Sequence, residues 1–197
     1  MNKGFLDTIS GLAKSFGIDL GKIKNVVPSP GAKTKAFKFN SIPQDVTQLQ
    51  ALPEAALTDV YATAALTLLA LARYIEDKQA GIEMLNFLKG PDNMTQAELQ
   101  HISDRFMDGK TYKVKSFFDG ATPSNNYTPS VPYGIHVSSN PYSFDNEGWA
   151  TLYLKSGGAD NPRPVRLRQK PSTGQWFLVE IQFLGDIRVP ADQDKWA

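Results

Sequence analysis

The side chains best suited to chemistry gather between residues 149 and 176 of this chain of 197 residues. They are two tryptophans, a tyrosine and three arginines, namely Trp149, Tyr153, Arg163, Arg166, Arg168 and Trp176. Aromatic rings and arginine are the usual anchors of binding interfaces. The planar guanidinium group also binds a carboxylate or phosphate through two parallel hydrogen bonds. These residue types favour recognition of a partner protein or a small anionic ligand over bond-making chemistry.

The connection Gly157–Pro164 has an unusual composition for a link between two strands. Its paired glycines permit backbone geometry that is closed to other residues, and Asp160 can accept hydrogen bonds from local amides. Pro162 and Pro164 hold Arg163 in an extended pose. Two interpretations follow. The loop presents an arginine for anion recognition, or it is a sheet connection whose arginine pairs with a nearby carboxylate of the chain.

Three runs of alternating apolar residues must position these side chains. They cover Trp149–Lys155, Val165–Lys170 and Trp176–Leu184. Alternation of this kind predicts strands with one buried face. We expect the face that carries Leu152 to be core. The opposite face then presents the aromatic and arginine side chains, unless a helix covers it and makes them core as well.

The pairing of the last two runs is constrained, because a slip by one residue would turn a strand over. The register that keeps apolar residues together pairs Leu167 with Val179, Val165 with Ile181, Arg166 with Glu180 and Lys170 with Trp176. This register requires an odd-length connection, with a bulge at Gly174.

Helical periodicity dominates the chain before these strands. The strongest helix is expected over residues 53–78, with an apolar stripe wide enough for burial on much of its girth. Further helices are expected over 80–88 and 96–107, the latter opened by a capping-box pattern from Thr95 to Glu98. Shorter strands are expected over 36–40, 112–118 and 134–138.

This order of elements predicts an α+β fold, in which N-terminal helices, one of them long and buried, pack on a C-terminal antiparallel sheet. Cystatin-like and NTF2-like architectures share that arrangement, which is an analogy of fold and carries no function.

The first residues form a separate part of the predicted organisation. Apolar residues at helical spacing indicate an amphipathic helix, carried by Phe5, Leu6, Ile9, Leu12 and Phe16. A linker with proline and glycine follows, so we expect this part to span residues 1–30 and a single α+β domain to span 31–197. The helix either docks on the domain or binds a membrane surface or a partner.

Composition excludes several classes of function. The chain has no cysteine, which removes disulfides and thiolate metal sites and fits a reducing, cytoplasmic compartment. Its two histidines cannot form a histidine-rich metal site, and no phosphate-binding loop is present, so we expect no metal and no cofactor. A net charge of +1 argues against a generic nucleic-acid binder. A hydrolase with a cleft near His136 remains an alternative.

Short runs in the C-terminal third form a recognisable pattern. They are GWATLY at 148–153, KSGGAD at 155–160, PRPV at 162–165, LR at 167–168, QW at 175–176, IRVP at 187–190 and DKWA at 194–197. This pattern resembles a family of uncharacterised bacterial proteins of about this length, a domain of unknown function. The resemblance is weaker through the helices. It implies a bacterial, single-domain protein, and it brings no activity and no catalytic residue.

Overall fold

A computed structural model describes residues 32–196 of the chain. These residues belong to one compact unit that begins at Gly31. The predicted amphipathic helix, from Phe5 to Phe16, lies outside the described residues, so that helix and the domain boundary at residue 30 stay predictions. Within residues 32–196 no helix is both long and apolar enough to cross a membrane.

Five strands form one antiparallel sheet whose spatial order follows the chain, β1-β2-β3-β4-β5. They are β1 (Thr34–Phe39), β2 (Tyr133–Ser138), β3 (Trp149–Leu154), β4 (Arg163–Gln169) and β5 (Trp176–Ile181). The α+β class is therefore confirmed, and so are the strands predicted over 36–40 and 134–138. The edges of the sheet are β1 and β5.

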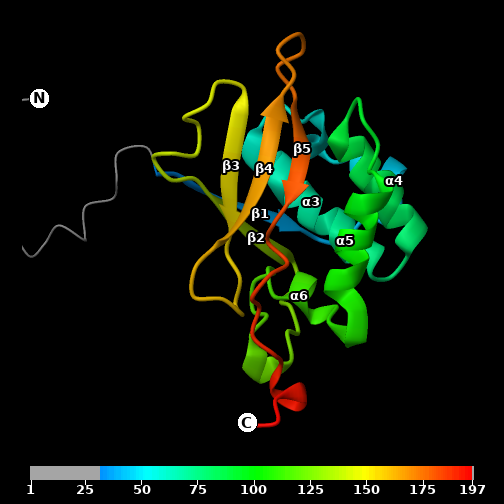
Figure 1. The fold of residues 1–197 in the computed structure, drawn as a ribbon, viewed down its shortest axis with the longest axis vertical. Coiled ribbons are helices and arrows are strands. Elements are labelled where there is room, and N and C mark those ends of the chain that lie inside the picture. Colours follow the sequence, from blue (N-terminus) through cyan, green and yellow to red (C-terminus); the bar gives the residue numbers. More distant parts are fainter. Residues whose placement is uncertain (1–31, 197) are drawn as a thin grey trace, which may run out of the picture. The chain divides into compact units, whose positions relative to one another are not determined.

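The helices lie between β1 and β2 in the chain. They are α2 (Val46–Gln50), η1 (Pro53–Ala56), α3 (Val60–Tyr74), α4 (Lys78–Lys89), α5 (Gln96–Phe106), η2 (Met107–Gly109), α6 (Tyr112–Lys115) and η3 (Pro123–Asn125), and η4 (Ala191–Gln193) follows the sheet. Figure 1 shows α3 behind the sheet and α4 and α5 beside β5. We call the face of the sheet that packs on α3 the inner face, and the opposite face the outer face.

Helix α3 is the centre of the core. All of its residues are buried, and it contacts every strand of the sheet. The predicted helix over 53–78 is wrong at both ends, because two breaks divide it. Leu57 adopts a left-handed conformation with φ of 59°, which separates η1 from α3. At the other end Asp77 caps α4 by accepting a hydrogen bond from the Ala80 amide.

The register between β4 and β5 is as predicted at one end only. Val165 pairs with Ile181 and Arg166 with Glu180, but Leu167 pairs with Leu178 rather than Val179. The predicted odd-length connection is wrong, since the Lys170 amide donates to Gln175 O at 2.8 Å and closes an even loop over 171–174. A bulge inside β5 supplies the extra residue instead. Apolar residues therefore stay on the inner face at both ends of the pair.

The strand predicted over 112–118 is wrong. The chain forms α6 and a series of turns there. Phe117 and Phe118 are both buried, although they are neighbours, and a strand with one buried face would expose one of them. The apparent alternation of Tyr112 and Val114 with lysines is short enough to fit a single helical turn.

The two faces of the sheet predict opposite responses to adjacent substitutions in β3. Leu152 is fully buried on the inner face, while Thr151 lies half-buried on the outer face. Leu152→Ala should lower the free energy of unfolding by about 2–5 kcal/mol because it leaves a cavity. Thr151→Ala, the matched control, should change it by less than about 1 kcal/mol. Urea denaturation measures both, and equal losses would contradict this assignment of faces.

Candidate functional site

The outer face of the sheet presents one tryptophan between two arginines. Trp149 pairs with Arg168 across β3 and β4. The guanidinium carbons of Arg166 and Arg168 lie 5.3 Å and 5.0 Å from the centre of the Trp149 ring. Both distances are within the range of cation–π attraction. Both arginines are exposed and Trp149 is half-buried. We call these three residues the Trp-Arg face.

The two arginines differ in their carboxylate partners. Arg166 Nη1 lies 3.5 Å from Glu180 Oε2, a contact between exposed groups that contributes little to stability. This pair was predicted from the register. Arg168 forms no salt bridge with any residue from 32 to 196. The indole ring orients its guanidinium group and leaves the hydrogen-bond donors to solvent or to a ligand.

Two other aromatic candidates lie in different surroundings. Tyr153 shares the outer face, and its hydroxyl accepts a hydrogen bond from Asn140 Nδ2 at 3.0 Å. Trp176 does not share that face, because the bulge in β5 turns its side chain inward, where it packs against the core. Its predicted pairing with Lys170 is replaced by pairing with Gln169. Trp176 is therefore removed from the predicted surface.

Arg163 and Asp160 belong to a separate group of residues, which we call the C-terminal cluster. It holds the segment that follows β5 through contacts with Asp186 and Arg188. Arg163 Nη2 donates to Asp186 O at 2.8 Å, and Asp160 forms an ion pair with Arg188. The Arg188 amide in turn donates to Gly158 O at 2.9 Å. Arg163 is the first residue of β4 and lies on the same side of the strand as the buried Val165, so it does not face Trp149. The loop connects β3 and β4, but Arg163 binds a backbone carbonyl group rather than the carboxylate that the second interpretation expected.

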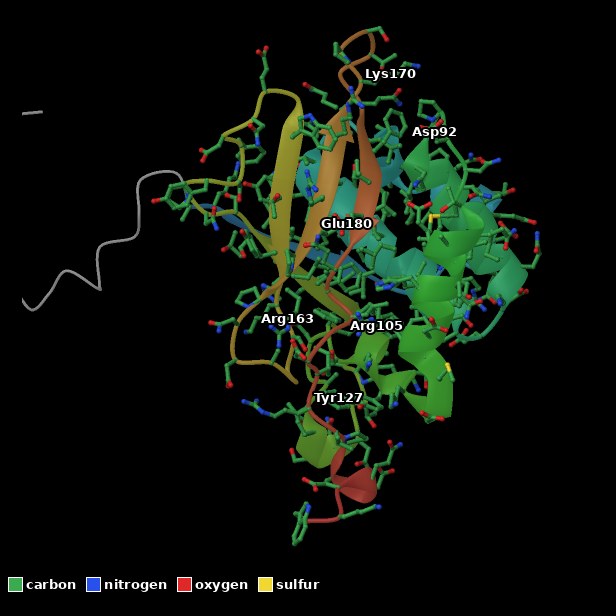
Figure 2. The ribbon with its side chains drawn as sticks, viewed as in Figure 1. Asp92, Arg105, Tyr127, Arg163, Lys170 and Glu180 are labelled. Atoms are coloured by element: carbon green, nitrogen blue, oxygen red, sulfur yellow. The ribbon has the colours of Figure 1, made fainter. Side chains whose placement is uncertain are left out.

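The paired glycines have a packing reason. A Cβ atom at Gly157 would lie 2.0 Å from Ala121 O, and one at Gly158 would lie 2.2 Å from the Tyr127 hydroxyl oxygen. Tyr127 is fully buried and donates from its hydroxyl to Arg188 O at 2.7 Å. The loop and the C-terminal segment therefore pack against this tyrosine, which lies below Arg163 in the view of Figure 2. The final tryptophan, Trp196, is 95% exposed and does not anchor the chain end.

A hollow of about 320 Å³ adjoins the Trp-Arg face. Trp149 and Arg168 form one side, and the corner between α4 and α5 forms the other. Its further lining includes two lysines and an aromatic ring, Lys89, Lys170 and Phe177. Sequence reasoning did not predict this hollow, because the packing of α4 and α5 beside β5 determines where their corner lies. Gly90 was the residue that could have indicated the close approach, since a Cβ atom there would lie 2.2 Å from the Phe177 ring.

His136 contacts one carboxylate in this structure. Its Nε2 atom lies 3.1 Å from Asp119 Oδ2, and both side chains are partly exposed. Within residues 32–196 no hydroxyl group hydrogen-bonds to His136. In the same part of the chain no cluster of three or more His, Cys, Asp or Glu residues could hold a metal ion.

Comparison with known families adds an identity for most of the chain. The model of a domain of unknown function, DUF6935, matches residues 41–191. The chain belongs to this family. The match covers the Trp-Arg face, the adjoining hollow and the C-terminal cluster, and it leaves out β1. No curated protein and no solved structure matches the chain.

The buried tyrosine of the DUF6935 domain predicts a pH dependence of stability. Burial raises the pKa of the Tyr127 hydroxyl from 10.0 to about 12, with a smaller contribution from Tyr112 and a partial offset by Arg188. Between these values the unfolded chain releases a proton that the folded chain retains. The free energy of unfolding should therefore fall as pH rises from about 10 to about 12, by on the order of 2 kcal/mol from this group.

Tyr127→Phe isolates this contribution. Urea denaturation at about pH 9 and about pH 11.5 should show a smaller loss of stability in Tyr127→Phe than in the parent chain. Tyr142→Phe is the matched control, because Tyr142 is 76% exposed, and it should retain the full loss. Identical pH dependence in all three chains would contradict the shifted pKa.

Proposed function

We propose that this chain is a non-catalytic binding module of the bacterial cytoplasm, which recognises an anionic group of a partner protein or small ligand at the Trp-Arg face. One observation carries the proposal. The guanidinium groups of Arg166 and Arg168 both stack on the indole ring of Trp149 on the outer face. The guanidinium group of Arg168 has no carboxylate partner among the described residues. Such a pair of cations held in place by a ring is suited to bidentate recognition of carboxylate or phosphate.

The hollow beside Arg168 supports a ligand with more than a charge. Trp149 and Phe177 contribute aromatic surface to it, and Lys170 contributes a further cation without an ion-pair partner in residues 32–196. Binding sites commonly combine apolar walls with a few charged groups that fix orientation. A ligand with an anionic group and an adjoining apolar part fits this arrangement.

Compartment and source rest on sequence alone. The absence of cysteine supports a reducing compartment, and the C-terminal pattern supports a bacterial source. Peripheral membrane attachment through the segment from Phe5 to Phe16, and hydrolysis near His136, stay predictions because no observation favours either.

Titration followed by NMR tests the proposal. The chain has three tryptophans, so the indole N–H signals of Trp149, Trp176 and Trp196 can be assigned one by one. The probes are inorganic phosphate, citrate and a hexaglutamate peptide. At least one of them should shift the Trp149 signal in a saturable manner while leaving that of Trp196 unchanged.

Two charge variants make the test specific. Arg168→Gln should weaken binding of that probe by about tenfold or more, because it removes the unpaired charge-assisted donors. Lys155→Gln removes an exposed cation just beyond the opposite end of β3 and should bind within about twofold of the parent chain. The proposal fails if no probe moves the Trp149 signal, or if Arg168→Gln binds as tightly as the parent chain.

A further inference from the structure

We propose that the free edge of β5 accepts an extended peptide of a partner protein as an added antiparallel strand, in the groove between β5 and α5. This inference rests on the proposed function in one respect, because one end of the groove is formed by Arg168. It adds the class of partner, a peptide with apolar side chains followed by an acidic residue, and the mode of binding through the main chain.

The first support is the backbone of β5. At its start the edge is occupied by the chain itself, because the Trp176 amide donates to Leu57 O at 2.7 Å and Trp176 O accepts from the Thr63 hydroxyl at 3.4 Å. The backbone of Trp176 thus points away from β4. In an antiparallel ladder the backbone groups alternate between partner and edge. Leu178 and, beyond the bulge, Ile181 therefore direct their backbone groups away from β4 toward the groove, at whose floor the two residues are 3% and 9% exposed.

These edge groups have no partner in the part of the chain that the structure describes. Outside the β4–β5 ladder, no backbone hydrogen bond among residues 32–196 involves residues 178–182. A strand edge with unpaired donors and acceptors is a template for another chain.

The second support is the shape beside this edge. Three hollows of about 320, 280 and 250 Å³ follow β5 one after another and share lining residues. The middle one is largely apolar, with walls formed by Ala97 and Ile102 of α5, by Met94 just before that helix, and by Val179 and Ile181 of β5. Figure 2 shows Lys170, Glu180 and Arg105 in this order along the groove. The groove therefore extends along the strand rather than forming a single pocket.

The two edges of the sheet differ in their protection. The edge strand β1 carries Lys35 and Lys38, and lysines on an edge strand discourage pairing with another chain. β5 has a single charged residue, Glu180, and this side chain is in contact with Arg166 on the outer face. The edge of β5 is thus left without the charges that protect β1.

Charge selects the peptide and its direction. Two carboxylates that line the groove are engaged within the chain, since Glu98 pairs with Lys89 at 2.5 Å and Glu180 contacts Arg166. At the end of the groove where β5 begins, Asp92 also contributes to the lining, but it forms no salt bridge with Arg168 or Lys170. The two cations therefore outnumber the single carboxylate at that end. An antiparallel peptide has its C-terminal end there. Its acidic residue should therefore follow its apolar residues in sequence.

Selection from a random peptide library tests the inference. The library is displayed on phage and selected on the full chain, and the selected peptides are then measured on the Ala97→Trp chain. Ala97 is exposed on α5, so the larger ring fills the groove without entering the core. Selected peptides should show apolar residues at alternate positions followed by an acidic residue. A synthetic peptide of that sequence should bind the Ala97→Trp chain at least about tenfold more weakly than the parent chain.

Controls separate strand pairing from contact with the charged face. Gln100→Trp places the same ring on an exposed position of α5 outside the groove and should bind within about twofold of the parent. The bound peptide should slow amide hydrogen exchange at Leu178 and Ile181, and N-methylation of alternate peptide amides should abolish binding. If the library yields no peptide, or if exchange at these two amides is unchanged, the inference is overturned. Peptides that depend on Arg168 but bind Ala97→Trp equally well would overturn strand pairing and leave the proposed function standing.

Discussion

The structure depends on the burial of one helix on all sides. Every residue of α3 is buried, with the five strands on one side and α4 among its other neighbours. Burying a leucine side chain contributes about 1.5–3 kcal/mol, and α3 carries four of them, Leu66, Leu68, Leu69 and Leu71. A helix of this kind can exist only if the sheet supplies a continuous apolar face. The inner residues of all five strands meet that requirement.

This constraint also determines what the outer face can be. Because the helices contact the inner face, the side chains of β3 and β4 that point the other way meet solvent along residues 149–154 and 163–169. Arginines tolerate that position, and the ring of Trp149 gives two of them a fixed arrangement. At β5 the corner between α4 and α5 reaches the edge of the sheet, where Gly90 packs on Phe177. The groove and the Trp-Arg face meet at that point.

Local pattern predicted those features that depend on alternation and capping. The five strands of the sheet, the capping box at Thr95 and the contact between Arg166 and Glu180 follow from residue types a few positions apart, whereas the strand expected over 112–118 did not form. Features that depend on distant packing were missed. The bulge that turns Trp176 inward balances an even loop at 171–174, and the sequence permits either solution. Likewise, Gly157 and Gly158 suggest a flexible loop until Ala121 and Tyr127 are seen against them. The candidate site was half predicted: Trp149, Arg166 and Arg168 meet, whereas Arg163 and Asp160 hold the C-terminal segment.

In this fold the outer face of the sheet is open and the inner face is closed. The chain has no cysteine, so a single introduced thiol reports on one position without interference. Thr151→Cys on the outer face and Ala150→Cys on the inner face are neighbours in β3, and Ala150 is 2% exposed. The rate at which each thiol reacts with a small disulfide reagent, in the full chain under native conditions, measures access to each face. We expect rapid reaction at residue 151, a rate lower by orders of magnitude at residue 150, and equal rates in urea. Slow reaction at both positions would show instead that the outer face is covered.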